Sequence, residues 1–261
     1  MSYKDVFKRY EIKYLITNEQ FKIIKDAMRE HMEQDKYGHS MIYNIYYDTP
    51  EMYLVRRSNE KPDYKEKLRV RSYGTAEKDS PVFVEIKKKY DGVVYKRRLS
   101  MKEHELSEFM NSEVEKHNFE DGELSIDDVT NHRKAFKNSQ IKKEIDYFRS
   151  FYEGIAPRVF ISYSREAYFS KTDKDFRMTF DSDISYRDYD LTLRKGPEGK
   201  KIIGEDKVLL EVKTAMGIPR WLLDIFTEQK IYKTSFSKYG YAYKDMIKVE
   251  KLKNTGGINI V

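Results

Sequence analysis

Several segments of the chain alternate charged and apolar side chains with the two-residue period of a β-strand. Residues 65–71 read Lys-Glu-Lys-Leu-Arg-Val-Arg, and related alternation runs through residues 85–89, 96–98 and 209–213. Successive side chains of a strand point to opposite faces of its sheet. Each segment therefore predicts a strand with one mostly cationic face and one largely apolar face. A sheet with one solvated face also alternates, but here the cationic bias repeats from strand to strand.

A triplet of Glu, an aliphatic residue and Lys recurs at residues 11–13, 85–87 and 211–213. Each triplet places a carboxylate and an ammonium group side by side on one strand face. We expect the apolar faces to pack under helices and the charged faces to line a wet interior. A phosphate chain with a metal ion fits a cavity with this charge pattern.

The same patterns predict the order of the strands. They are expected near residues 7–16, 41–48, 64–73, 81–89, 93–100, 157–166, 176–184 and 206–214. Tyr90-Asp91-Gly92 predicts a hairpin turn between two of them.

Helix signals lie between and after these strands. One helix is expected to start at Thr17, with Gln20 in the capping-box position, and a short one at Pro50, capped by Thr49. Residues 219–226 and 236–249 predict two further helices. Residues 101–154 carry mixed charge with helical periodicity, which predicts a helical insertion or lid.

These elements predict an α+β fold. About eight mostly antiparallel strands would close into a barrel with helices packed outside, because closure removes the sheet edges and encloses a lumen. No linker divides the chain, so residues 1–252 are expected to form a single domain that includes the insertion. Residues 253–261 are expected to form a flexible tail.

Composition narrows the chemistry of such a lumen. The chain of 261 residues has 22 Tyr and 14 Phe, which supply apolar area for a folded core. It has no Cys, and its five His follow no ligand spacing, which excludes thiolate sites and argues against zinc. A metal would be held by carboxylates and phosphates, which suits Mn²⁺ or Mg²⁺.

The distribution of charge argues against a nucleic-acid partner. The net charge is only +6, and the basic residues are spread over separate strands and mixed with acids. The sequence has no apolar run of about 18 residues and no signal-peptide pattern, so we expect a cytoplasmic protein.

The motifs, taken in order, resemble the VTC domain, the catalytic domain of polyphosphate polymerases in the CYTH-like superfamily of triphosphate tunnel metalloenzymes. The resemblance covers nearly the whole chain and depends on the order and spacing of individually weak motifs. They are Tyr10-Glu11-Ile12-Lys13-Tyr14, Ile45-Tyr46-Tyr47-Asp48-Thr49, Lys67-Leu68-Arg69-Val70-Arg71, Val84-Glu85-Ile86-Lys87-Lys88-Lys89, Tyr95-Lys96-Arg97-Arg98, Tyr163-Ser164-Arg165, Arg177-Met178-Thr179-Phe180-Asp181, Leu210-Glu211-Val212-Lys213 and Phe236-Ser237-Lys238-Tyr239.

The resemblance implies a tunnel of eight antiparallel strands that binds ATP, inorganic triphosphate or polyphosphate. The implied catalytic phosphate ligands are Lys13, Arg69, Arg71, Lys87, Lys96, Arg165, Arg177 and Lys238. The implied substrate-binding residues are Tyr163, Ser237, Lys233 and Arg98. The implied metal-binding carboxylate is Glu211.

Other residues keep two interpretations. Glu11 and Glu85 could bind the metal or pair with neighbouring cations, and Asp181 and Asp183 could bind the metal or serve a turn or cap. Tyr46 and Tyr47 are assigned to packing.

Two departures from the resemblance bear on function. The related CYTH hydrolases begin with Glu-x-Glu-x-Lys, whereas Arg9 stands at the first of these positions. This favours the VTC branch over thiamine-triphosphatase or cyclase types. Family members can also carry a Lys three residues before the Lys of the Ser-Lys pair; here that residue is Ser235, with Lys233 nearby.

We therefore predict a metal-dependent phosphotransferase that passes the γ-phosphoryl group of ATP to a polyphosphate chain. Phosphoryl transfer needs in-line positioning and charge neutralisation more than covalent help from the protein. Two alternatives stay open: a triphosphatase or polyphosphatase of the same fold, and a non-catalytic polyphosphate or inositol-phosphate binding module. The presence of Glu211 favours an enzyme. A separate membrane protein is a candidate partner, which would place the chain at the membrane periphery.

Overall fold

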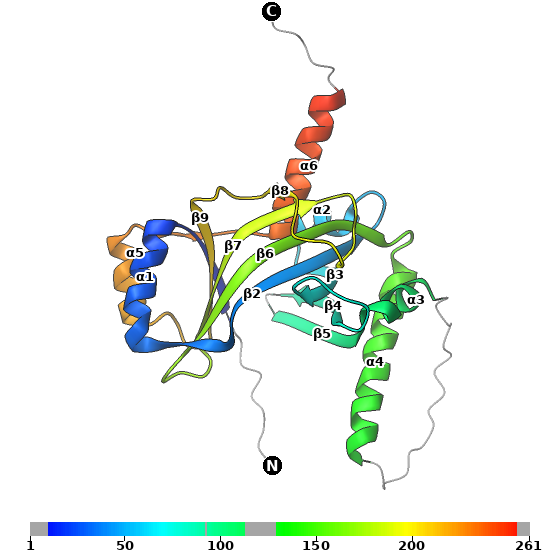
Figure 1. Cartoon of the computed structure of the whole chain (residues 1–261), viewed down its shortest axis with the longest axis horizontal. Helices are drawn as coiled ribbons and strands as arrows, with labels where there is room; N and C mark the ends of the chain where they lie inside the picture. The colour runs from blue at the N-terminus through cyan, green and yellow to red at the C-terminus, as the bar shows by residue number, and fades with distance from the viewer. Residues whose placement is uncertain (1–9, 92, 113–128, 255–261) are drawn as a thin grey trace, which may run out of the picture. The chain divides into compact units, whose positions relative to one another are not determined.

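The computed structural model describes residues 10–91, 93–112 and 129–254 (Figure 1). The elements in chain order are β1 (Tyr10–Thr17), α1 (Asn18–His31), β2 (Met32–Asp48), α2 (Tyr53–Asn59), β3 (Tyr64–Tyr73), β4 (Pro81–Tyr90), β5 (Val93–Lys102), the 3-10 turn η1 (Glu103–Glu105), α3 (Leu106–Asn111), α4 (Val129–Phe151), β6 (Ala156–Ser170), β7 (Arg177–Arg187), β8 (Lys200–Lys201), β9 (Lys207–Thr214), α5 (Arg220–Glu228), β10 (Lys233–Thr234) and α6 (Lys238–Asn254). The predicted α+β class with an antiparallel sheet is confirmed.

The strands of the described residues hydrogen-bond in the order β10-β1-β9-β7-β6-β2-β3-β4-β5, and β8 adds to β7. β8 and β10 are only two residues long. The remaining strands are the ones that the alternation predicts. The hydrogen-bonded path described here has two ends, β10 and β5.

The chain falls into two compact units. Unit 1 comprises residues 1–43, 161–187 and 197–261, and unit 2 comprises residues 44–160 and 188–196. Strands β2 and β6 each contribute residues to both units. The single domain expected over residues 1–252 stays a prediction.

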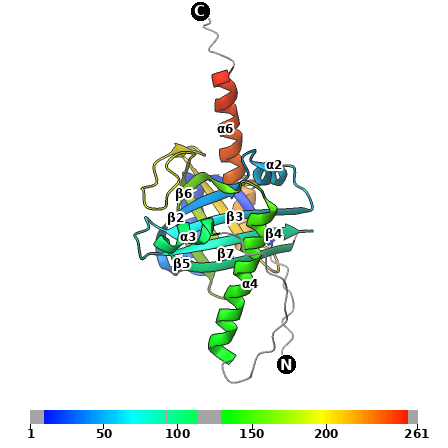
Figure 2. The ribbon, with the colours of Figure 1, turned by 90° about the vertical axis from the view of Figure 1, so that its right-hand side faces the viewer.

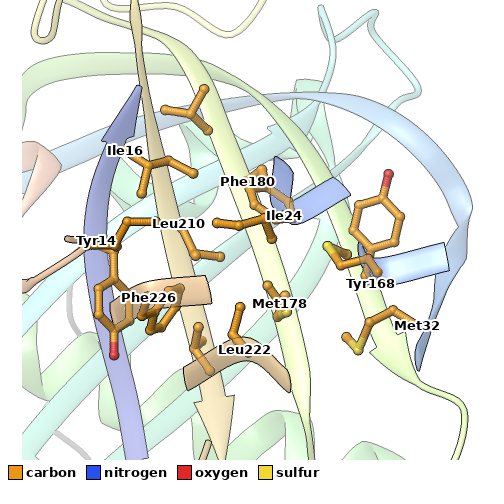
Figure 3. Close-up of a cluster of buried hydrophobic side chains, with 14 of the residues drawn as sticks. Tyr14, Ile16, Ile24, Met32, Tyr168, Met178, Phe180, Leu210, Leu222 and Phe226 are labelled. Carbon is orange, nitrogen blue, oxygen red and sulfur yellow. The ribbon is translucent and has the colours of Figure 1, made fainter. Parts of the chain in front are cut away.

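In unit 1, helices cover the apolar face of β1, β9 and β7. Tyr14, Leu210 and Phe180 stand side by side across these strands. They pack in one buried cluster with residues of α1 and α5, among them Ile24 and Phe226 (Figure 3). Each fully buried side chain of this kind stabilises the fold by about 1.5–3 kcal/mol. The predicted arrangement, with apolar faces under helices, is confirmed for unit 1.

The start of α1 follows the sequence signal. The backbone N–H of Gln20 donates to Thr17 Oγ1 over 3.2 Å, and the backbone N–H of Thr17 donates to Gln20 Oε1 over 2.9 Å. This reciprocal capping box satisfies two backbone donors that the first helical turn leaves open. The predicted capping box is confirmed.

Unit 2 contains the meander β3-β4-β5, with the predicted hairpin between Tyr90 and Val93. Leu68, Val84 and Ile86 on one of its faces are buried. Helix α4 lies beside these strands (Figure 2). The other face of the meander carries the cationic site that is described below.

Two local predictions in this region are wrong. The helix expected at Pro50 begins at Tyr53 instead, after Met52 in a left-handed conformation. Buried Asp48 holds the start of α2, because its carboxylate accepts hydrogen bonds from the backbone N–H groups of Leu54 and Val55. Strand β2 starts at Met32 and not near residue 41, because residues 32–40 are largely polar and hide the alternation.

The expected insertion and tail are only partly described. Within residues 101–154, η1, α3 and α4 are helical, and residues 113–128 lie outside the described part. Helix α6 runs to Asn254, and residues 255–261 of the expected tail lie outside the described residues. Arg9, which departs from the hydrolase motif, lies outside them as well. None of the helices in the described part of the chain combines the length and apolar character that a membrane crossing requires.

Candidate functional site

The charged face of unit 1 brings together a set of side chains that we call the Glu211 cluster: Lys13, Arg165, Asp181, Glu211 and Lys238. Lys13 on β1 stands opposite Glu211 on β9, and its Nζ lies 3.2 Å from Glu211 Oε1. Arg165 comes from β6, Asp181 from β7 and Lys238 from the first residue of α6. Strands β1, β6, β7 and β9 thus bring four of these side chains together, and α6 supplies the fifth.

Ser237 presents Lys238 to the cluster. Its Oγ accepts a hydrogen bond from the backbone N–H of Gly240 over 3.2 Å, which caps the start of α6. The Ser-Lys pair of the sequence is therefore a helix cap followed by a buried ammonium group, since Lys238 is 9% exposed.

Asp181 ties the cations of this cluster together. It is completely buried, and its two carboxylate oxygens lie 2.6 Å from Nε and NH2 of Arg165. Lys238 Nζ also donates to Asp181 Oδ2. A fork of this kind fixes the guanidinium in orientation as well as position. Burial opposes the charge on Arg165, but Asp181 outweighs it and raises the pKa of the guanidinium.

Glu211 is held more loosely than Asp181. Its oxygens lie 3.2 Å from Lys13 Nζ, 3.4 Å from Lys238 Nζ and 3.5 Å from Arg165 NH2. Burial opposes ionisation of Glu211, but Lys238, Lys13 and Arg165 outweigh it, so its pKa lies well below the ordinary value. The site therefore offers a charged carboxylate whose contacts can rearrange.

Tyr163 supplies an apolar wall. It is 3% exposed, and its ring centroid lies 4.4 Å from Lys238 Nζ and 5.1 Å from Arg165 Cζ. Cations over an aromatic face gain about 0.5–2 kcal/mol, depending on their desolvation. Tyr163 is thus a support for the two cations of the cluster.

A divalent ion at Glu211 would need ligands besides the protein side chains, such as phosphate oxygens. No group of three His, Asp or Glu side chains in the described part of the chain is placed to hold a metal ion by itself. Thr179 stands opposite Glu211 on β7, and its Oγ1 is buried with no hydrogen-bond partner among the described residues. A buried hydroxyl without a partner is costly, which indicates that a water or ligand oxygen completes this position.

Three predicted residues of unit 1 lie at the margin or outside the cluster. Glu11 is 33% exposed in its side chain and lies 3.5 Å from Lys13 Nζ. Arg177 is exposed and stands opposite Lys213 on the charged face. Lys233 is exposed and pairs with Tyr14, so it belongs to the helix-covered face and away from Lys13.

Unit 2 presents a second site, the cationic face of β3, β4 and β5. Rows of paired residues cross the strands, such as Lys67, Lys87 and Lys96, then Arg69, Glu85 and Arg98. The cations of this face are Lys65, Lys67, Arg69, Arg71, Lys87, Lys89, Lys96, Arg98 and, at its edge, Lys102. Glu85 is the one carboxylate that these three strands place on it. Such a face fits a polyanion.

Glu85 is a counter-ion here. It is 1% exposed, and its oxygens lie 2.8 Å from Arg69 Nε, 2.7 Å from Lys96 Nζ and 2.6 Å from Arg98 Nε. Burial opposes its ionisation, but Arg69 and the other cations outweigh it and lower its pKa far below the ordinary value. Of its two interpretations, the structure favours pairing with cations over binding a metal.

Two side chains of β2 orient the arginines of the cationic face. Arg71 Nε donates to Asn44 Oδ1 over 2.9 Å, and Arg69 NH1 donates to the Tyr46 hydroxyl over 3.2 Å. Tyr46 was expected only to pack, but its hydroxyl also accepts a hydrogen bond from Arg69.

Lys96 on this face and Tyr46 on β2, which bonds to Arg69, both have a lowered pKa. Burial lowers the pKa of Lys96 to about 8, although Glu85 opposes the shift. For Tyr46, burial alone would raise the pKa, but Arg69 and Lys67 outweigh it and lower the pKa to about 8. The charge of the cationic face therefore depends on pH in a range that binding experiments can reach.

Sequence reasoning did not assign definite roles to Asp181, Asn44 and Thr179. Asp181, Thr179 and Arg177 are spaced two residues apart, so they share one face of their strand. This spacing could have indicated that Asp181 and Thr179 belong to the charged site. Asn44 carries no such signal, because only the pairing of distant strands brings it to Arg71.

Comparison with known proteins gives one family. The sequence matches the VTC domain over residues 8–247. No curated protein matches the chain.

Solved structures give weaker similarities. A candidate adenylate cyclase from Vibrio parahaemolyticus has 11% identity and a TM-score of 0.41, over 90% of this chain and 97% of that one. A candidate adenylyl cyclase from Hippeastrum, described as having a dominant triphosphatase activity, has 13% identity and a TM-score of 0.46, over 88% and 92%. A chain of the Schizosaccharomyces pombe Mediator head module has 9% identity and a TM-score of 0.39, over 95% of both. The family match therefore carries the assignment.

Proposed function

Because the chain belongs to the VTC domain family, we propose that it transfers the γ-phosphoryl group of ATP to the end of a polyphosphate chain. The observation that carries this proposal is the cationic face of unit 2, where Glu85 is the one carboxylate among the lysines and arginines of three strands. Arginine forks suit bidentate contacts with phosphate oxygens, and lysines add point charge. Such a surface suits a chain of phosphates better than a single small anion.

The Glu211 cluster supports the transfer step. A terminal oxygen of the polyphosphate acceptor attacks the γ-phosphorus, the bond from this phosphorus to the β–γ bridging oxygen breaks, and ADP leaves with the electron pair. Arg165 and Lys238, which Asp181 holds in place, are suited to bind the transferring group. Glu211 and oxygens of the phosphates would hold Mn²⁺ or Mg²⁺, which neutralises phosphate charge when bound.

Further parts of the proposal rest on the family relationship and on the sequence pattern. The strands would close into the eight-stranded tunnel that the sequence predicts. The protein would work in the cytoplasm, and a separate membrane protein would be its partner at the membrane periphery. Nucleic acid is not an expected partner.

The test is to incubate the purified full chain with ATP and Mn²⁺ or Mg²⁺ and to measure polyphosphate, ADP and free phosphate together. Polymer with matching ADP supports the proposal. Free phosphate without polymer would replace the polymerase by a triphosphatase. Binding of polyphosphate without turnover, with either metal ion, would identify a binding module.

A matched pair of variants tests the role of Glu211. Glu211→Gln keeps the shape but removes the charge, so turnover should be lost while much of the triphosphate binding remains. Glu205→Gln is the control, because Glu205 is exposed outside the cluster. Full activity of Glu211→Gln would show that the metal assignment is wrong.

A further inference from the structure

Unit 2 contains a cavity that shares only Lys65 with the cationic face used in the phosphotransfer proposal. It has a volume of about 400 Å³ and lies among α2, the C-terminal end of α4 and the first residues of β3. This volume lies within the range of about 300–1,000 Å³ that is usual for ligand sites. Glu66 and Lys88, which line it, pair across β3 and β4 on the face opposite to the cationic face.

Aromatic side chains form the walls of this cavity. Tyr147 and Phe151 stand one helical turn apart on α4 with their rings stacked, 5.9 Å between centroids. They are 64% and 62% exposed, and Tyr53 and Tyr64 are each 44% exposed. Large aromatic surfaces left open around a cavity indicate stacking with a planar ligand.

A buried carboxylate also lines the cavity. Glu66 is 9% exposed, the Tyr64 hydroxyl donates to its Oε2 over 2.9 Å, and the Tyr152 hydroxyl donates to its Oε1 over 2.6 Å. Burial, together with these bonds to Glu66, raises the pKa of both tyrosines, so the hydroxyls remain donors. An ionised carboxylate has about four acceptor positions, so Glu66 can accept further N–H groups from a ligand.

The remaining charged groups of the cavity are cations. Arg57, Lys65 and Lys88 line it, and Lys88 Nζ lies 4.0 Å from Glu66 Oε2. Arg57 pairs with Glu60 at the surface, where such pairs are weak and exchange readily. The cavity thus combines stacking surfaces, an acceptor for N–H donors and a cationic rim.

We propose that this cavity binds a mononucleotide whose base carries an exocyclic amine. The base stacks on Tyr147 and Phe151, its amino group donates to Glu66, and its phosphate lies against the cationic rim. Aromatic walls with a carboxylate would also suit a quaternary ammonium ion, but Arg57, Lys65 and Lys88 repel a cation. The proposal does not depend on the phosphotransfer function.

The experiment is isothermal titration of the full chain with AMP, GMP, CMP and UMP. Arg69→Ala is titrated beside the wild type, because binding of a nucleotide at the cationic face would weaken in this variant and binding in the cavity would not. We expect saturable binding, with the amine-bearing bases bound about tenfold more tightly than UMP, because the two carbonyl groups of uracil face the carboxylate unfavourably.

Variants separate the parts of the site. Phe151→Ala and Tyr147→Ala should each weaken AMP binding about tenfold or more, since stacking contributes about 1–3 kcal/mol per base. Glu66→Gln should remove most of the preference for AMP over UMP. Tyr232→Ala, at an exposed tyrosine of unit 1, is the control and should bind AMP like the wild type. All these variants should keep the far-UV circular dichroism spectrum of the wild type, which shows that they are folded.

Three outcomes would overturn the proposal. The first is the absence of saturable binding for all four nucleotides at millimolar concentration. The second is AMP binding that survives the double replacement of Tyr147 and Phe151. The third is binding of choline that is tighter than binding of AMP, which would assign the cavity to an organic cation instead.

Discussion

Replacing Asp181 by asparagine should destabilise unit 1 strongly, because Asp181 is the buried counter-ion of Arg165 and Lys238. Removing one partner of a buried ion pair costs about 3–5 kcal/mol, since the remaining charge stays buried without compensation. Here the side chains of Arg165 and Lys238 are 18% and 9% exposed, and Glu211 lies 3.5 Å and 3.4 Å from them. Glu211 compensates in part, so we expect a loss near the lower end, about 3 kcal/mol.

The sequence provides a local reporter for this measurement. Trp221 is the only tryptophan; it lies on α5, stacks on His31 at 4.7 Å and packs against the apolar core of unit 1. Its fluorescence during urea denaturation therefore follows the unit that contains Asp181. The free energy of unfolding of wild type and Asp181→Asn is obtained from the two transitions.

Asp183→Asn is the matched control on the same strand. Asp183 is 62% exposed in its side chain and pairs with Lys201 over 2.8 Å at the surface. Such pairs contribute about 0–1 kcal/mol. Its positive φ of 52° also suits asparagine. The reasoning is refuted if Asp181→Asn loses no more stability than this control.

A ligand titration separates positioning from stability alone. Triphosphate at about 100 times its dissociation constant should stabilise the wild type by about 2.7 kcal/mol. In Asp181→Asn the same concentration should give a smaller gain, because Arg165 and Lys238 are no longer held in place. An equal gain at equal ligand concentration would limit Asp181 to a structural role.

Further predictions concern the cationic face. Arg69→Ala should weaken triphosphate binding about tenfold and lower turnover in parallel, since charge-assisted hydrogen bonds contribute about 1.5–3 kcal/mol; calorimetry and ATP turnover measure the two effects. Glu85→Gln should lower the melting temperature of the free protein but tighten triphosphate binding, because the cations lose their internal competitor. Raising the pH from about 7 to about 9 should weaken binding, since Lys96 loses its positive charge and Tyr46 gains a negative one, each with a pKa of about 8. Tyr46→Phe should reduce this pH dependence in the same titration.

The two-residue period was sufficient to predict which strand residues share a face. Lys13 and Glu11 lie on one side of β1, while Ile12 and Tyr14 lie on the other, as the alternation requires. The rows across strands could not be predicted, because they depend on which distant segments pair. The sequence gives no reason to place Glu211 opposite Lys13 and Thr179, or Arg98 opposite Glu85.

Capping signals worked where one local interaction decides the backbone. Thr17 and Gln20 satisfy each other within one helical turn, so the pattern predicts the start of α1 correctly. At Thr49 and Pro50 the same kind of signal was right only in part: Thr49 Oγ1 accepts a hydrogen bond from the backbone N–H of Tyr53 over 3.1 Å, but the helix does not begin at Pro50. The buried carboxylate of Asp48 binds backbone donors further along and moves the start of α2 to Tyr53.

The two charged clusters differ in how their cations are neutralised, and this difference suggests separate tasks. In the Glu211 cluster, Asp181 and Glu211 accompany Lys13, Arg165 and Lys238, so carboxylates nearly balance the cations. On the cationic face, Glu85 alone accompanies a large excess of lysines and arginines.

An excess of buried and half-buried cations is costly in the free protein and is relieved when a polyanion binds. The cationic face is therefore the part whose stability should depend most on phosphate. The Glu211 cluster, whose charges nearly balance, should be stabilised less when a polyanion binds alone. Its loosely held Glu211 would be stabilised if a divalent ion and phosphate oxygens arrived together, because the added cation and anions would leave the balance of charge nearly unchanged. We therefore propose that affinity for the phosphate chain resides mainly in β3, β4 and β5, and that any dependence on a metal ion would reside in β9.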